Sequence, residues 1–183
     1  IIDNIAPVVT CPANIVVNTN PQQCGATVVV PQPTYIEACG SVTIINSFNQ
    51  SSNATGFYPV GTTTVTWTVT DNCGNSTQCS MTVKVIDNEL PVITCPADII
   101  ICSTEQLVLG SATATDNCGV YTITSNAPQT FAVGTTLVVW TATDINGNSN
   151  ACTQSVTIIP LAIVNAGIDE IICEEQQITI STA

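Results

Sequence analysis

The sequence predicts an all-β protein made of β-sandwiches in tandem. Val, Ile and Thr are abundant, and runs of Ala, Leu, Glu and Lys, which favour helices, are missing. Apolar and polar residues alternate in stretches such as TTTVTWTVT at 62–70, and turns rich in Asn, Gly and Pro separate these stretches. Two long phrases occur twice, which indicates two copies of one module.

The repeated phrases define these copies. IIDNIAPVVTCPANI at 1–15 returns 84 residues later as VIDNELPVITCPADI. PVGTTTVTWTVTDNCGNSTQC at 59–79 returns only 73 residues later as AVGTTLVVWTATDINGNSNAC, so the second copy is eleven residues shorter. Cys39 and its counterpart Cys118 are 79 residues apart, which divides the loss into five residues before this Cys and six after it. Both losses fall in segments with the composition of loops.

The repeats predict four segments: the tail of a preceding module at 1–2, module one at 3–86, module two at 87–160, and the first strands of a truncated third module at 161–183. In module one we expect seven strands, at 8–17 with a break at Pro12, then at 26–31, 41–47, a weak pair within 48–60, 63–70 and 78–86. Proline breaks the first strand because it has no N–H for the ladder. Short strands at this spacing, with no helical pattern between them, are typical of a β-sandwich.

The cysteine content indicates an extracellular protein. Ten Cys occur without any His and without a C-x-x-C pair. That pattern is poor for zinc, but it is ordinary for modules that are stapled by disulfides in an oxidising environment.

The charge excludes several classes of partner. The net charge is −12, and Lys84 is the one cationic side chain. Nucleic acid is excluded because neutralising its backbone needs Lys and Arg. No apolar run approaches the roughly 18 residues of a membrane span, so we expect no membrane insertion. Cations are the natural small partners of such a chain.

Several phrases together resemble the hyalin repeat, or HYR, module: DN…P.VTCP, QCGA, CGSVTI and PVGTTTVTWTVTD..GNST.C. The resemblance covers nearly all of both copies, although the second copy has a short polar turn in place of QCGA. It implies immunoglobulin-like sandwiches in an elongated array, as in extracellular adhesion and matrix proteins. In bacteria it implies large surface adhesins of the kind exported by the type IX system. The segment AIVNAGIDEIICEEQQITIST resembles the opening of a PKD-like or immunoglobulin-like module.

The implied fold suggests two disulfides. The first and last strands of such sandwiches lie side by side, which pairs Cys11 with Cys79 and, in module two, Cys95 with Cys152. Each bridge closes a long loop, and the chain-entropy model gives a stabilisation of roughly 4 kcal/mol for a loop of this length. A module of fewer than ninety residues has a modest core and benefits from such a bridge.

Two sets of pairs are open for the other six cysteines, Cys24, Cys39, Cys73, Cys102, Cys118 and Cys173. In the default set, the disulfides form within modules, as Cys24–Cys39 and Cys102–Cys118. This set leaves Cys73 and Cys173 without partners. However, a strand of six residues spans about 20 Å and separates the first pair, whereas a disulfide needs Cα atoms within about 7 Å. This favours Cys39–Cys73 and a cross-module Cys24–Cys118. Cys102 would then reach Cys173, unless Cys173 pairs within its own module.

Acidic residues recur at the module ends. In the implied sandwich, three segments of each module converge at one pole: the linker, the loop between the strands at 26–31 and 41–47, and the turn between 63–70 and 78–86, with their counterparts in module two. These segments carry the candidate calcium ligands Asp3, Asp71, Asp87, Glu89, Asp116 and Asp144, with Glu37 beside them. Oxygen ligands on loops suit Ca²⁺. The alternative is that Asp-Asn and Asp-x-x-Gly-Asn are turn formers that bond only their own backbone.

No catalytic set is present, and we expect no enzyme, although a pair of carboxylates alone does not exclude a hydrolase. Trp67 and Trp140 occupy equivalent strand positions, where a core role outweighs a platform for sugar. The sequence therefore predicts a stalk or filament segment whose partners are the neighbouring modules of its own chain, with self-assembly into filaments. The alternative is an adhesive module that binds a surface glycan or protein through its loops. The loop at 46–58, with Phe57 and Tyr58 at its end, favours some binding.

Overall fold

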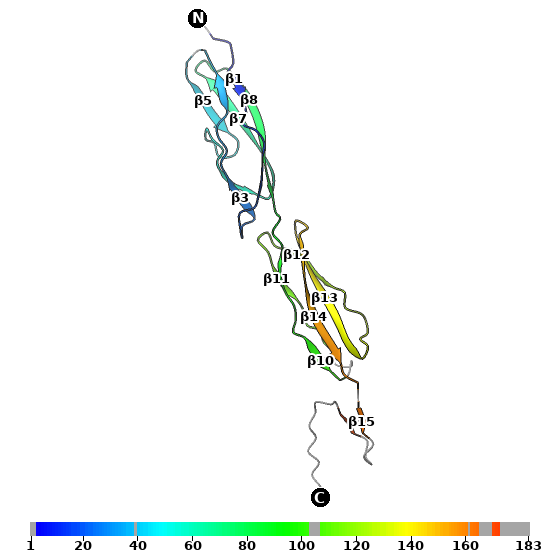
Figure 1. Cartoon of the computed structure of the whole chain (residues 1–183). Coiled ribbons are helices and arrows are strands. Elements are labelled where there is room, and N and C mark those ends of the chain that lie inside the picture. Colours follow the sequence, from blue (N-terminus) through cyan, green and yellow to red (C-terminus); the bar gives the residue numbers. More distant parts are fainter. Residues whose placement is uncertain (1–2, 39, 103–106, 161, 165–169, 173–183) are drawn as a thin grey trace. The chain divides into compact units, whose positions relative to one another are not determined.

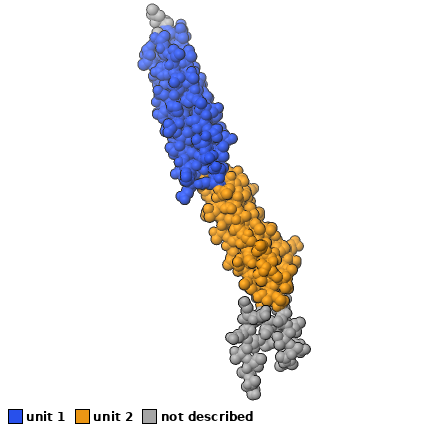
Figure 2. Space-filling view, viewed as in Figure 1, with its two compact units in different colours: residues 1–89 blue, residues 90–183 orange. Residues whose placement is uncertain are grey.

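The computed structural model describes residues 3–38, 40–102, 107–160, 162–164 and 170–172. The chain divides into two compact units, residues 1–89 and 90–183 (Figures 1 and 2). The described residues form strands, turns and loops without any helix, and therefore include no helix that could cross a bilayer. The protein is all-β, with a sandwich in each unit.

The first unit is built on a four-stranded sheet. Its strands are, in spatial order, β2 (Ile15–Asn18), β8 (Ser76–Ile86), β7 (Gly61–Asp71) and β5 (Val42–Asn46). The long strands β7 and β8 form an antiparallel hairpin, whereas β2 runs parallel to β8. Every second residue of β7 from Val65 to Asp71 is buried, which is the period of a strand with one face on the core.

Two short antiparallel pairs form the opposite layer. β3 (Gly25–Val28) pairs with β6 (Gly56–Pro59), and β1 (Val8–Thr10) pairs with β4 (Thr34–Ile36). The first strand thus breaks after Cys11, at Pro12, and its second half β2 joins the other sheet, as the sequence predicts. The core lies between the two layers, and its fully buried members include Trp67, Tyr58, Val30, Val65 and Val83.

The second unit repeats the main sheet. Its strands are β10 (Ile99–Ile101), β14 (Ser149–Ile158), β13 (Gly134–Asp144) and β12 (Val120–Ser125) in spatial order, and β10 runs parallel to β14. β9 (Val92–Thr94) pairs with β11 (Thr113–Thr115) as β1 pairs with β4. No counterpart of the β3–β6 pair occurs within residues 90–102 and 107–160. After this unit, β15 (Ala162–Val164) pairs with β16 (Glu170–Ile172).

The strands differ from the predicted ones in two places. Of the weak pair of strands predicted within 48–60, only β6 forms, and the segment before it is a series of turns and bends, because Asn46 bonds to its backbone. β4 was not predicted, since its three residues are all exposed and show no alternation.

Candidate functional site

Asp71 organises the turn between β7 and β8. Its Oδ1 atom accepts hydrogen bonds from the backbone N–H groups of Cys73 and Asn75, both at 2.8 Å. Its Oδ2 atom accepts one from the side-chain amide of Asn75, also at 2.8 Å. The Asn75 side chain, followed by the backbone N–H groups of the turn, holds the pKa of Asp71 below its ordinary value. The carboxylate is therefore charged, and Oδ2 keeps one lone pair for another partner.

Three carboxylates converge at this end of the first unit. Asp3, Glu37 and Asp71 each offer a carboxylate oxygen, and these atoms all lie within 4.8 Å of one another. Asp3 precedes β1, Glu37 follows β4 and Asp71 ends β7, so the topology brings the ends of three strands together. The Asn75 amide donates a further hydrogen bond to the backbone oxygen of Asp3 at 3.1 Å and fixes the segment before β1 to the turn.

This arrangement fits an oxygen-bound cation. Calcium binds oxygens at 2.3–2.6 Å, so two ligands of one ion are at most about 5.2 Å apart. The separation of the three carboxylate oxygens is within that limit. Like charges at this distance repel one another, and a divalent ion between them would remove the repulsion.

The second unit repeats part of this arrangement. Asp144 Oδ1 accepts hydrogen bonds from the N–H groups of Asn146 and Asn148 at 2.8 Å, and Oδ2 accepts one from the Asn148 amide at 2.7 Å. Burial opposes the charge of Asp144, but the hydrogen bonds from Asn148 and the turn outweigh it and lower the pKa. Asp116 uses Oδ1 to accept bonds from the N–H groups of Cys118 and Gly119.

The Oδ2 atom of Asp116 bears most directly on whether a cation binds here. Oδ2 is buried and accepts no hydrogen bond. A carboxylate oxygen of Asp116 lies within 4.8 Å of one of Asp144. A buried polar oxygen without a partner is costly, and a bound cation would satisfy it.

Asp87 and Glu89 lie at the end of the first unit. Asp87 is buried, and its Oδ1 atom accepts hydrogen bonds from the Thr19 hydroxyl at 3.5 Å and from the Glu89 N–H at 3.3 Å. Glu89 accepts from the Gln22 N–H at 3.3 Å. These bonds tie the end of the unit to the turn after β2. The calcium site that the sequence suggests for Asp87 and Glu89 stays a prediction.

Disulfides join the first and last strands of each unit. Cys11–Cys79 has a Cα separation of 5.7 Å, and Cys95–Cys152 has one of 5.8 Å. These are the two pairs that the implied sandwich fold suggests.

The predicted Cys39–Cys73 disulfide is wrong, because Cys73 is an exposed, free thiol. The turn that carries Cys73 directs the neighbouring Asn72 toward the segment after Cys39. Ser41 Oγ donates a hydrogen bond to Asn72 Oδ1 at 3.1 Å, and the Asn72 amide packs on Gly40. Location at the same pole was therefore too coarse a criterion for pairing.

The partners of the remaining cysteines stay predictions. Cys24, Cys102 and Cys118 are each disulfide-bonded. Cys39 and Cys173 lie outside the described residues, as do residues 1–2 and most of the expected third module.

The two Trp residues serve the cores of their units. Trp67 is fully buried, and its Nε1–H donates to the backbone oxygen of Ser52 at 3.0 Å. Trp140 is partly buried, and its Nε1–H donates to Gln154 Oε1 at 3.1 Å. The two aromatic residues at the end of the 46–58 loop differ in exposure: Tyr58 is buried, and Phe57 is 50% exposed. The ring of Phe57 covers Gly25 of β3, where any Cβ would collide with it.

Sequence reasoning missed the centre of that loop. Asn46 is buried, and its amide donates to Asn49 Oδ1, Ser51 O and Asn53 O at 2.6–2.9 Å. Its Oδ1 atom accepts from the N–H groups of Phe48 and Asn49. An Asn at the end of a strand, before a run of Ser and Asn, was the available signal.

The model of the HYR domain matches residues 2–85 and 86–158. The chain belongs to the HYR domain family. It is 31% identical over 173 residues to hyalin of Strongylocentrotus purpuratus, covering 86% of this chain and 14% of that protein. Hyalin of Lytechinus variegatus is 31% identical over 175 residues, and the match covers 86% of this chain and 32% of that protein. A third relative is the Rattus norvegicus protein named sushi, von Willebrand factor type A, EGF and pentraxin domain-containing protein 1. It is 32% identical over 160 residues, and the match covers 84% of this chain and 4% of that protein.

The chain thus spans a minor part of these relatives. They are animal proteins, and they give no support to the resemblance with bacterial type IX adhesins. As an HYR chain with disulfides in both units, the protein is an extracellular or cell-surface, adhesion-related module.

Among solved structures, the chain is similar to human protocadherin-24 EC1-2, with a TM-score of 0.41 and 15% identity, covering 87% of this chain and 100% of that one. Human mucin-like protocadherin EC1-2 gives a TM-score of 0.40 and 11% identity, and the match covers 84% of this chain and 98% of that one.

Proposed function

We propose that this chain is a structural, non-enzymatic segment of a large extracellular repeat protein, in which successive HYR sandwiches form a stalk that carries mechanical load. The observation that carries the proposal is the convergence of Asp3, Glu37 and Asp71 at one end of a sandwich whose first and last strands are joined by Cys11–Cys79. The disulfide limits how far the unit can extend. The carboxylates offer a calcium site where the linker meets the fold.

Calcium is the ion that this set suits best. The donors are all oxygens and lie on loops, with no His or Cys sulfur among them. Asp71 is already held by its turn, so it needs no rearrangement to act as a ligand. The buried Asp116 oxygen without a hydrogen bond supports a cation at Asp116 and Asp144 as well. Bound calcium would hold the linker against the sandwich and stiffen the stalk.

Single-molecule stretching of the whole chain tests the mechanical role. Each unit should open in one step, at a force above that which extends an unfolded chain. Reduction of the disulfides should lengthen the opening of the first unit by roughly 240 Å, because Cys79 follows Cys11 by 68 residues and the chain between them then extends at about 3.6 Å per residue. Smooth extension of the oxidised chain, without steps, would contradict the mechanical role.

An adhesive role is the second candidate, and Phe57 favours it. Half of this side chain is exposed beside the polar loop that Asn46 organises. An exposed aromatic ring next to ordered amides suits a glycan or protein surface. Binding of the fragment to immobilised glycans or matrix proteins, lost on Phe57→Ser, would support adhesion. Binding that is unchanged by this substitution would exclude Phe57 as the contact.

A further inference from the structure

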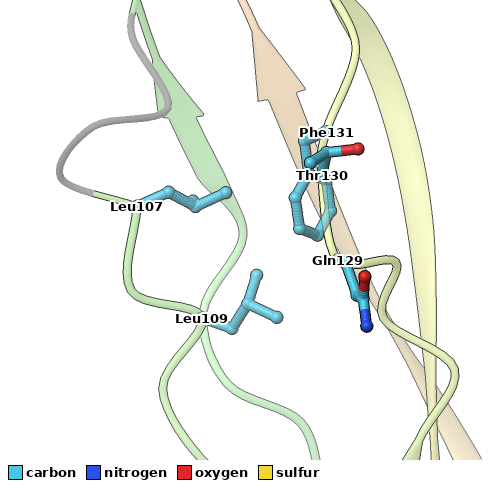
Figure 3. Close-up of a pocket in the computed structure, with 5 residues that line it drawn as sticks. All are labelled: Leu107, Leu109, Gln129, Thr130 and Phe131. Atoms are coloured by element: carbon cyan, nitrogen blue, oxygen red, sulfur yellow. The ribbon is translucent and has the colours of Figure 1, made fainter.

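The second unit contains a cavity that the function proposed above does not use. It has a volume of about 300 Å³ and lies between two segments of the unit, 107–109 and 129–131 (Figure 3). Leu107 and Leu109 project into it from one side, and Phe131 and Gln129 face them from the other. Its size is at the lower end of the range for ligand pockets, roughly 300–1,000 Å³.

The repeat identifies the same place in the first unit. The 79-residue offset equates Leu107 and Leu109 with Val28 and Val30, and the 73-residue offset equates 129–131 with 56–58. In the first unit these segments are closed by the β3–β6 ladder, which pairs Val28 with Gly56. The corresponding segments of the second unit have no ladder between them.

A phenyl ring fills this place in the first unit. Phe48 stacks on Tyr58 with ring centroids 4.2 Å apart and an interplanar angle of 7°. It also covers Gly56, where a Cβ would lie 2.8 Å from the ring. The counterparts of Tyr58 and Gly56 are Phe131 and Gln129, which both line the cavity.

The second unit has lost the segment that carries this ring. Ser47 and Asn126 are equivalent, since their backbone N–H groups bond to Thr66 and Val139 at corresponding positions of β7 and β13. The next equivalent residue is Ala54 in the first unit and Ala127 in the second, so 48–53 has no counterpart. The deletion removes Phe48 and leaves its partner surface behind.

The wall on the Leu109 side is held in place without a ladder. Gln154 is fully buried, and its amide donates to the backbone oxygens of Leu109 at 2.9 Å and Ala97 at 2.7 Å. Trp140 donates to the Oε1 atom of the same side chain. This network holds the backbone at Leu109 independently of any occupant.

We propose that the cavity binds the side chain of a phenylalanine that a partner protein presents on a polar loop. The ring stacks on Phe131, as Phe48 stacks on Tyr58, and packs against Leu107 and Leu109; the Cβ of Gln129, which Gly56 lacks, places it closer to the two leucines than Phe48 would lie. Gln129 at the rim bonds to the backbone of the incoming loop. The cavity then acts as a docking point for a second protein on this HYR domain.

A peptide titration against the whole chain tests the proposal. The probe is a synthetic peptide with the sequence of residues 47–55, SFNQSSNAT, and the matched control carries Phe48→Ala. The phenylalanine peptide should shift the Leu107 and Leu109 methyl resonances upfield in a saturable way, because of its ring current. The control should bind at least about tenfold more weakly, since it lacks the buried ring.

A variant that fills the cavity gives a second, independent test. Residues 48–53 are inserted between Asn126 and Ala127, together with Gln129→Gly, so that the graft recreates the loop of the first unit. The grafted chain should melt higher and should no longer respond to the peptide. Unmoved methyl resonances at millimolar peptide, equal binding of both peptides, or undiminished binding to a folded graft would each overturn the proposal.

Discussion

Trp140 donates a hydrogen bond from Nε1 to the Oε1 atom of buried Gln154, where the equivalent Trp67 of the first unit donates to the backbone oxygen of Ser52. The second unit has no residue equivalent to Ser52, and Gln154 replaces Met81 of the first unit. Gln154→Met should therefore leave Trp140 and the oxygens of Ala97 and Leu109 without partners. We expect a loss of about 2–4 kcal/mol in the free energy of unfolding of the second unit, measured by urea denaturation.

The reciprocal change in the first unit tests whether each residue suits only its own unit. Met81→Gln buries an amide beside a Trp67 that already has a partner, so it should destabilise the first unit as well. If Gln154→Met leaves the stability unchanged, the hydrogen bonds of Gln154 do not hold the second unit together.

The stability of both units should fall in acid. The pKa values of Asp71 and Asp144 are lower in the folded chain than the ordinary value of 3.8. Their contribution to stability is therefore complete above about pH 4 and is lost as the pH falls through the lower folded values. The variant Asp71→Asn, Asp144→Asn should be less stable at pH 7 and should show a shallower loss on acidification. A variant with an unchanged pH slope in urea denaturation would contradict this assignment.

The Cys11–Cys79 disulfide should be a main source of stability in the first unit. It spans a sequence separation of 68 residues, and the chain-entropy model gives about 4 kcal/mol for a loop of that length. Cys11→Ala, Cys79→Ala should lower the free energy of unfolding by roughly this amount. Cys73→Ser is the matched control, because Cys73 is exposed and free, and should change it by less than about 0.5 kcal/mol. Equal stabilities of the two variants would contradict the prediction.

Much of the fold follows from local patterns in the sequence. The long hairpins were predictable because alternation over eleven residues in β7 and β13 has no good alternative. The break at Pro12 was predictable because proline cannot join a ladder. β4 and the turns after Asn46 were not, since three exposed residues carry no pattern and a side-chain hub depends on the folded loop.

The candidate site was partly predictable for a related reason. Asp3, Glu37 and Asp71 flank strands whose ends meet at one pole, so the topology alone brings them close. The direction of a single side chain in a turn is not given by topology, and the Cys39–Cys73 pair failed for that reason. The cavity at Phe131 follows from a deleted segment, and its presence depends on how the remaining wall is held.

A calcium titration followed by residue-resolved NMR tests the central claim most directly. Calcium added to the whole chain should shift the amide resonances of the turn at 71–75 in a saturable way, with a midpoint in the range of roughly 10⁻⁴–10⁻³ M that is typical of extracellular modules. Glu37→Gln should raise that midpoint at least about tenfold, whereas Asp98→Asn, which removes the same charge outside the first unit, should not. An absence of shifts at 10 mM calcium (about ten times the upper end of that range), or an equal midpoint in Glu37→Gln, would contradict a calcium-stiffened stalk.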